Sequence, residues 1–268
     1  AATVLGCMEE YAQTEWPNLN VYMNSITEQY ATFNISGPKT RNIIEKVFPE
    51  VNFSNEAFPF MTFQFHEYED TPIRILRASF TGEMGYEIYV PSNQALKIWE
   101  KIISFGKEFG LMPYGTETMH LLRAEKGYII VGQDTDGSIT PLDLGLDWMI
   151  GKSKKDFLGK RSLIRSDTVR KDRKQLVGIL PTNKNEKLEE GQHIILDKEI
   201  KTPTPMLGHI TSCYQSPTLG HNFALAVIKN GQSLIGTKAF ASTPELKTIE
   251  VEIVEPIFYD KENTKLAS

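Results

Sequence analysis

The sequence has few cysteines and no long apolar run, and each absence excludes a class of protein. Its two cysteines, Cys7 and Cys213, lie far apart and outside any Cys-x-x-Cys pair, so we expect neither a disulfide framework nor a zinc site. No apolar stretch approaches the roughly 20 residues that cross a bilayer, so no membrane association is expected. A basic leader followed by an apolar core is also missing. A protein of the reducing cytoplasm is the expectation.

Common catalytic and ligand-binding patterns are missing as well. The five histidines are scattered without metal-ligand spacing, and no P-loop or dinucleotide-binding glycine motif occurs. The net charge of −5 gives no global reason to expect nucleic acid. Charge is uneven only locally, because residues 152–174 carry ten Lys or Arg against three Asp. This stretch is interpreted as a solvated connector; the alternative is a surface for a polyanionic ligand or an acidic partner domain.

Length and patterning predict an α+β protein of more than one domain. The chain of 268 residues exceeds the usual size of one hydrophobic core, and its 24% charged residues are typical of a globular protein. After residue 175, short strand patterns alternate with Gly, Pro and Asn turns, which indicates a separate all-β barrel or sandwich. We therefore divide the chain into a first domain at 1–150, a basic connector at 151–174 and a C-terminal β-barrel at 175–268.

Periodicity also predicts particular elements of the first domain. Short strands are expected at 20–26 and 29–35. Two helices follow the 3.6-residue period, one starting after Ser36 and one capped by Ser92 or Asn93. The first is expected to bury Ile43, Ile44, Val47 and Phe48, and the second to bury Leu96, Trp99, Ile102 and Ile103.

The chain is organised around residues 77–91, which are typical of a strand, a glycine turn and a second strand. Gly82 and Gly85 allow a positive φ or a close approach of the backbone, and Glu83 lies between them. From these residues alone, Glu83 is either a solvated hairpin tip, the simpler interpretation, or an acceptor aimed into a cleft. Arg123 lies on a helix expected at 117–126. A ligand with a pterin-like ring and a carboxylate tail would use both side chains, because a carboxylate accepts bonds from an N–C–N edge and an arginine pairs with a carboxylate.

Five segments in order make the sequence familiar. Together they resemble the glycine-cleavage T-protein (aminomethyltransferase) family, over nearly the whole chain. Within it, further segments such as 127–137 and 258–260 look most similar to the C-terminal part of the α subunit of heterotetrameric sarcosine oxidases. The five segments are Arg77-Ala-Ser-Phe-Thr-Gly-Glu-Met-Gly-Tyr-Glu, Leu121-Leu-Arg-Ala-Glu-Lys-Gly, Thr140-Pro-Leu-Asp-Leu-Gly-Leu-Asp-Trp, Asp156-Phe-Leu-Gly-Lys-Arg and Ser216-Pro-Thr-Leu-Gly.

The resemblance implies T-protein-like α/β domains with ferredoxin-like elements, followed by a β-barrel, and a site for tetrahydrofolate. By position in the matching motifs, Glu83 would hydrogen-bond the pterin and Arg123 would contact the folate. Tyr259 is the best match for a tyrosine near the C-terminus that lines the site. Phe80 stands where many relatives have a tyrosine, so one hydroxyl contact is expected to be missing. No residue is assigned as a catalytic base.

The resemblance also implies an activity and partners. A flavin in a partner subunit would oxidise sarcosine to an imine, and tetrahydrofolate held by this domain would take up the one-carbon unit as 5,10-methylenetetrahydrofolate. Flavin and NAD are expected only in other domains or subunits of a hetero-oligomeric sarcosine oxidase. The family's segment with an aspartate near the folate would precede residue 1, so the chain alone is expected to be inactive. The alternatives are a stand-alone aminomethyltransferase of the glycine cleavage type and a non-catalytic folate-binding or assembly module.

Overall fold

The computed structural model describes residues 1–267, which form two compact units. The first unit contains residues 1–79, 83–113 and 266–267, and the second contains residues 80–82 and 114–265. The division at residues 150 and 174 that the sequence suggests stays a prediction. Each unit has its own sheet and its own hydrophobic core.

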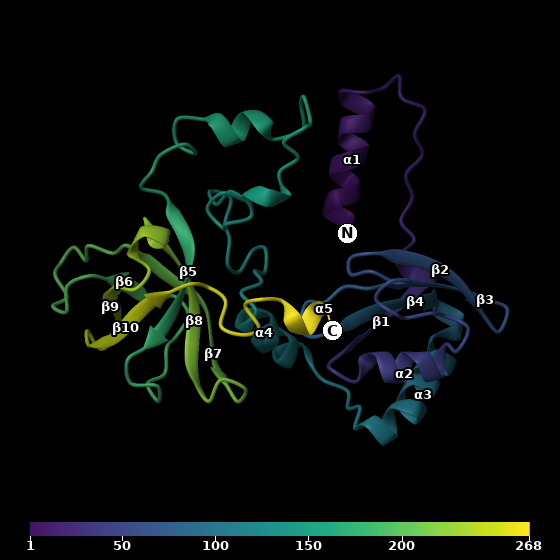
Figure 1. Ribbon diagram of the computed structural model, residues 1–268. Coiled ribbons are helices and arrows are strands. Elements are labelled where there is room, and N and C mark those ends of the chain that lie inside the picture. The colour runs from purple at the N-terminus through teal and green to yellow at the C-terminus, as the bar shows by residue number, and fades with distance from the viewer. Residues whose placement is uncertain (268) are drawn as a thin grey trace. The chain divides into compact units, whose positions relative to one another are not determined.

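The first unit is a four-stranded antiparallel sheet with two helices against it (Figure 1). Its strand order is β1-β4-β3-β2, so the first strand in the chain lies beside the last. The turn that contains Glu83 connects β3 to β4, which are neighbours in the sheet. The elements are β1 (Tyr30–Ser36), α2 (Thr40–Val47), β2 (Phe63–Tyr68), β3 (Thr71–Leu76), β4 (Gly85–Pro91) and α3 (Ala95–Gly106).

The helices of this unit follow the sequence pattern to different degrees. The stripe expected on α2 is confirmed, since Ile43, Ile44, Val47 and Phe48 are all buried. On α3 the expected stripe is wrong by part of a turn: the helix buries Ile98, Ile102 and Gly106, while Leu96 is exposed. Apolar residues occur on more than one face of α3, so periodicity alone did not select the face that the sheet covers.

The N-terminal segment of the first unit adds little to its core. Helix α1 (Ala2–Thr14) is fully described by the structure, and none of its residues is buried. The strand predicted at 20–26 is wrong, because the chain there, all of it described, forms no ladder. Val21 and Tyr22 are exposed. A strand is stable only when a neighbouring strand satisfies its backbone groups, and no strand pattern encodes that neighbour.

The second unit contains a closed six-stranded barrel, which confirms the predicted C-terminal barrel (Figure 1). The order around the barrel is β10-β5-β8-β7-β6-β9. Closure leaves no free sheet edge, which stabilises short strands. The strands are β5 (Lys174–Pro181), β6 (His193–Ile195), β7 (Gly208–Ser216), β8 (His221–Lys229), β9 (Lys238–Ser242) and β10 (Thr248–Val254).

Strand β8 is buried on both of its faces, and this brings a helix onto the barrel. Ala224, Ala226 and Ile228 point into the barrel core, where small side chains fit a narrow interior. The alternate residues Phe223 and Leu225 pack in a second cluster with Ala124 of helix α4 (Thr116–Glu125). Helix α4 therefore covers the outer surface of the barrel beside β8.

Short elements complete the chain. No helix within residues 1–267 is long and apolar enough to cross a membrane. The remaining helix is α5 (Thr264–Ala267), and short 3-10 turns occupy Thr27–Gln29, Ser92–Gln94, Lys107–Phe109, Asp147–Met149, Lys160–Ile164 and Gly231–Leu234.

Candidate functional site

The turn between β3 and β4 needs both of its glycines. Gly82 has φ +84°, a conformation that residues with a Cβ rarely adopt. A Cβ at Gly85 would lie 2.7 Å from the carbonyl oxygen of Ala78, too close for any side chain. The expectation of an unusual backbone conformation and a close approach is confirmed. Glu83, held between them, is partly exposed.

Arg123 is fully buried at the end of α4, where its guanidinium binds four groups of the second unit. One terminal nitrogen, Nη1, donates to the carboxylate of Asp134 and, at 3.0 Å, to the carbonyl oxygen of Tyr128. The other, Nη2, donates to Ser212 Oγ at 2.8 Å and to Tyr214 Oη at 3.3 Å. The remaining donor, Nε, is buried and has no hydrogen-bond partner among residues 1–267.

Asp134 is the buried counter-charge of Arg123, and sequence reasoning missed it. Its carboxylate also accepts hydrogen bonds from Thr211 Oγ1 and Ser212 Oγ, both at 2.6 Å, and from the Ile130 N–H at 2.9 Å. In the sequence, Asp134 lies between Gly132 and Gly137, in a polar pattern typical of a turn. The spacing of 11 residues from Arg123 matches no helical pairing rule, so no local pattern could have found the pair.

Two of the ordered motifs meet at Glu125. Its carboxylate accepts a hydrogen bond from Ser216 Oγ, and Ser216 Oγ accepts one from the Leu219 N–H at 2.8 Å. Burial raises the pKa of Glu125, and the hydrogen bond from Ser216 opposes this shift. The carbonyl oxygen of Glu125 accepts the N–H groups of Phe258 and Tyr259, both at 2.9 Å. The end of α4 therefore sets the backbone position of Tyr259.

A third motif, 140–148, is held by a buried ion pair. Asp143 Oδ2 accepts from the N–H and the hydroxyl of Thr140, both at 2.8 Å, and the guanidinium of Arg173 binds the same carboxylate. Burial alone would raise the pKa of Asp143, but the hydrogen bonds from Arg173 and Thr140 outweigh it and the net shift is downward. Arg173 also pairs with Asp167, so part of the basic stretch serves internal contacts.

We expect Asp143→Asn to lower the free energy of unfolding by about 3 kcal/mol at pH 7, because it leaves Arg173 without its buried partner. The pKa of Asp143 is lower in the folded chain than its ordinary value of 3.8. Its ionised form therefore stabilises the fold above that pH, and this contribution is lost as pH falls through the folded-state pKa. Urea unfolding at pH 7 and below about pH 4 should show the difference between wild type and variant shrinking. The control Asp172→Asn removes an exposed ion pair with Arg170 and should leave the free energy of unfolding unchanged at both pH values.

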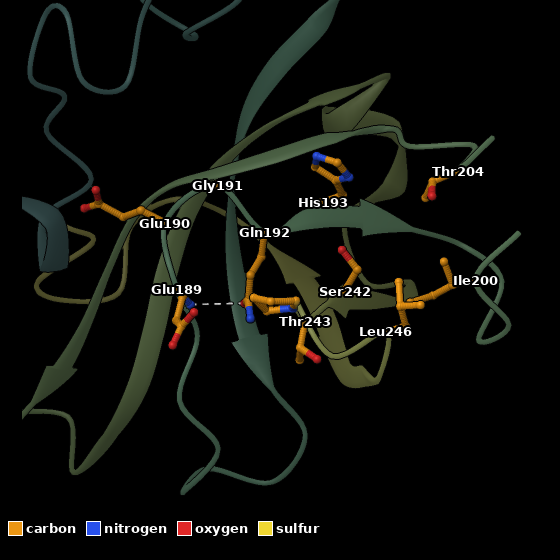
Figure 2. Close-up of a pocket in the computed structure, with 11 residues that line it drawn as sticks. Glu189, Glu190, Gly191, Gln192, His193, Ile200, Thr204, Ser242, Thr243 and Leu246 are labelled. Atoms are coloured by element: carbon orange, nitrogen blue, oxygen red, sulfur yellow. Dashed lines mark hydrogen bonds between the residues drawn. The ribbon is translucent and has the colours of Figure 1, made fainter. Parts of the chain in front are cut away.

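Two cavities of the second unit have linings that do not include the predicted site residues. One of about 400 Å³ is lined by Glu189, Glu190, Gln192 and His193 with residues of the β9–β10 turn, and Figure 2 shows Gln192 accepting the Glu189 N–H at 3.1 Å. The other, of about 1060 Å³, lies among residues 129–168. Glu83, Arg123 and Tyr259 line neither of these two cavities.

The three predicted folate contacts are thus distributed over both units. Glu83 belongs to the first unit, whereas Arg123 and Tyr259 belong to the second. Within the second unit, the end of α4 carries Arg123 and holds the backbone of Tyr259. Their roles toward a ligand stay predictions.

The fold and the motif contacts agree with known proteins. Residues 1–154 match the GCVT N-terminal domain, and residues 174–260 match the glycine cleavage T-protein C-terminal barrel domain. The chain belongs to the glycine cleavage T-protein family. The resemblance that the five ordered motifs suggested is confirmed.

Individual members of the family are similar to this chain to different degrees. The chain is 46% identical over 268 residues to sarcosine oxidase subunit alpha of Corynebacterium sp. (strain P-1), and 35% identical over 269 residues to that of Rhizobium meliloti (strain 1021). It is 30% identical over 252 residues to an aminomethyltransferase of Thermoanaerobacter pseudethanolicus. These alignments cover 99%, 99% and 91% of this chain. The chain spans 28% and 27% of the two oxidase subunits and 64% of the aminomethyltransferase.

A solved structure supports the fold. The crystal structure of the glycine cleavage system aminomethyltransferase T from Bartonella henselae matches with a TM-score of 0.73 at 21% identity. The match covers 96% of this chain and 67% of that one. The predicted T-protein-like fold with a C-terminal barrel is confirmed.

Proposed function

We propose that the chain is a tetrahydrofolate-binding, one-carbon-transfer domain that works within a sarcosine oxidase α subunit. The observation that carries the proposal is the 46% identity, over 99% of this chain, to a sarcosine oxidase subunit alpha. The lower identity of 30% to an aminomethyltransferase makes the stand-alone glycine cleavage enzyme the second candidate. Subunits of a hetero-oligomeric oxidase are the proposed partners, with flavin and NAD held outside this chain.

The side chains available in the structure suit tetrahydrofolate. Glu83 offers a partly exposed carboxylate, which can accept hydrogen bonds from the N–C–N edge of a pterin. Tyr259 offers a partly exposed side chain. The guanidinium of Arg123 is fully buried, so its proposed contact with folate rests on the family resemblance alone. When bound, tetrahydrofolate supplies the nitrogen nucleophiles that take up a one-carbon unit as 5,10-methylenetetrahydrofolate. The contribution of these residues is to bind and orient it and to exclude water.

The assay that tests the reaction uses the full-length protein with its partner subunits, sarcosine and tetrahydrofolate. Formation of 5,10-methylenetetrahydrofolate that requires both substrates is the expected result. Folate binding without product would favour a non-catalytic binding or assembly module. Product formed from a glycine-cleavage intermediate, and none from sarcosine, would favour the stand-alone aminomethyltransferase.

We expect Glu83→Ala to weaken tetrahydrofolate binding by about 1–3 kcal/mol, because a hydrogen bond to a charged group is lost. Isothermal titration calorimetry on the full-length protein measures this change directly. Glu87→Ala is the matched control: Glu87 lies four residues further, on β4, is also partly exposed, and accepts a hydrogen bond from Tyr89. An unchanged affinity in Glu83→Ala, or an equal loss in both variants, would show that Glu83 does not bind tetrahydrofolate.

A further inference from the structure

Lys126 and Asp260 form a buried ion pair that contacts two segments with predicted ligand contacts, the turn at Gly82 and the segment of Tyr259. The Lys126 ammonium lies 3.0 Å from Asp260 Oδ2 and also donates to the main-chain carbonyl oxygen of Asp260. The side chains are 2% and 4% exposed, so both charges are removed from water. A pair this deeply buried keeps a fixed geometry, because moving either partner leaves a buried charge unbalanced.

On one side, Lys126 supports the turn that leads into Glu83. A Cβ at Gly82 would lie 3.1–3.2 Å from Cβ, Cγ and Cδ of Lys126, so the aliphatic part of this lysine lies directly against the Gly82 backbone. The preceding residue but one, Phe80, stacks on Tyr128 with ring centroids 6.0 Å apart. Residues 80–82 therefore rest on the segment that ends α4, and Glu83 is the next residue in the chain.

On the other side, the same pair holds the segment that carries Tyr259. The Asp260 carboxylate also accepts the N–H and the hydroxyl of Thr264, at 2.9 and 2.7 Å, and the N–H of Lys265 at 3.1 Å. Burial would raise the pKa of Asp260, but these bonds and Lys126 outweigh it, so the net shift is downward and the carboxylate stays ionised. Tyr259, one residue earlier, donates its N–H to the Glu125 carbonyl oxygen.

We infer that Lys126, paired with Asp260, is a positioning residue that sets the Gly82 turn and the Tyr259 segment for folate binding. This inference rests on the proposed function. Lys126 does not itself contact the ligand: its stem fixes one segment and its ammonium fixes the other. Both segments therefore depend on one side chain, although they lie more than 170 residues apart in the sequence.

The test is Lys126→Met, which keeps an unbranched stem against Gly82 and removes the ammonium. Calorimetry with tetrahydrofolate on the full-length protein should show affinity weaker by about tenfold or more, since small displacements of positioned groups have large effects. Hydrogen–deuterium exchange without folate provides a second measurement. Amides of residues 80–85 and 256–262 should exchange faster in the variant, while those of strands β5 and β8 should not change.

Arg173→Met is the matched control, because it also removes the cation of a buried ion pair in the same unit, with Asp143. It should leave folate affinity and the exchange of both segments unchanged. If the wild type binds folate and Lys126→Met binds it with the same affinity, the inference is overturned and the proposed function stands. Absence of folate binding by the wild type would overturn both. Equal losses in the two variants would show general destabilisation and overturn the positioning role.

Discussion

Asp134→Asn is expected to lower the free energy of unfolding by about 3–5 kcal/mol, because it leaves the Arg123 guanidinium buried without a counter-charge. Arg123 and Asp134 are 0% and 1% exposed, so water cannot replace the lost partner. The carboxylate also accepts bonds from Thr211 and Ser212 of β7, so its loss loosens α4 from the barrel. Urea unfolding followed by circular dichroism measures the change.

A double variant distinguishes the effect of an unbalanced buried charge from a general disruption of core packing. In Arg123→Met with Asp134→Leu both charges are removed, and we expect a smaller loss than in Asp134→Asn alone. Asp197→Asn, which removes an exposed pair with Lys201, should have no measurable effect. A loss below about 1 kcal/mol in Asp134→Asn would mean that the buried pair does not hold α4 on the barrel.

Gly127→Ala is expected to destabilise the chain by about 2–4 kcal/mol, through two separate effects. Gly127 has φ +77°, which a residue with a Cβ adopts only with strain. A Cβ there would also lie 2.3 Å from the carbonyl oxygen of Pro256, a backbone atom that cannot rotate away. The segment from Pro256 would be displaced from the end of α4, so unfolding by urea should occur at a lower concentration.

Gly132→Ala isolates the first effect. Gly132 has φ +93°, and nothing lies within 4 Å of a Cβ built there. We expect a loss of about 1 kcal/mol from conformational strain alone. The difference between the two variants then measures the close approach of Pro256. Equal losses would show that only φ matters at Gly127 and that the segment from Pro256 accommodates a methyl group.

Local patterns predicted the elements whose partners are nearby or repeated. The buried stripe of α2 follows from apolar residues at helical spacing, since only one face of that helix is apolar. Short strand patterns at close spacing predict an all-β barrel or sandwich, because such strands must pair with one another, and the structure closes them into a barrel. The predicted strand at 20–26 failed for the opposite reason: its apolar residues have no neighbouring strand to complete a ladder.

The ordered motifs predict the candidate site residues, but the hydrogen-bond partners of these residues are known only from the structure. Arg123 was singled out for a ligand, and the structure gives it Asp134, Ser212 and Tyr214 as partners. Asp134 lies in a sequence pattern typical of a turn, but its carboxylate is buried against β7 hydroxyls 77 and 78 residues away. The sequence gives no sign that Lys126 is buried, because an isolated lysine at a helix end is ordinarily solvated.

The sequence by itself determined the family, the barrel and the turn that presents Glu83, because these depend on glycines, periodicity and motifs that are local in the chain. Only the tertiary structure decided which parts of the second unit Arg123, Glu125 and Lys126 bind. The partners of these charges come from β7, from the 130–134 loop and from the tail at 258–260. A buried charge is stable only where its partners converge, and that convergence is a property of the folded chain.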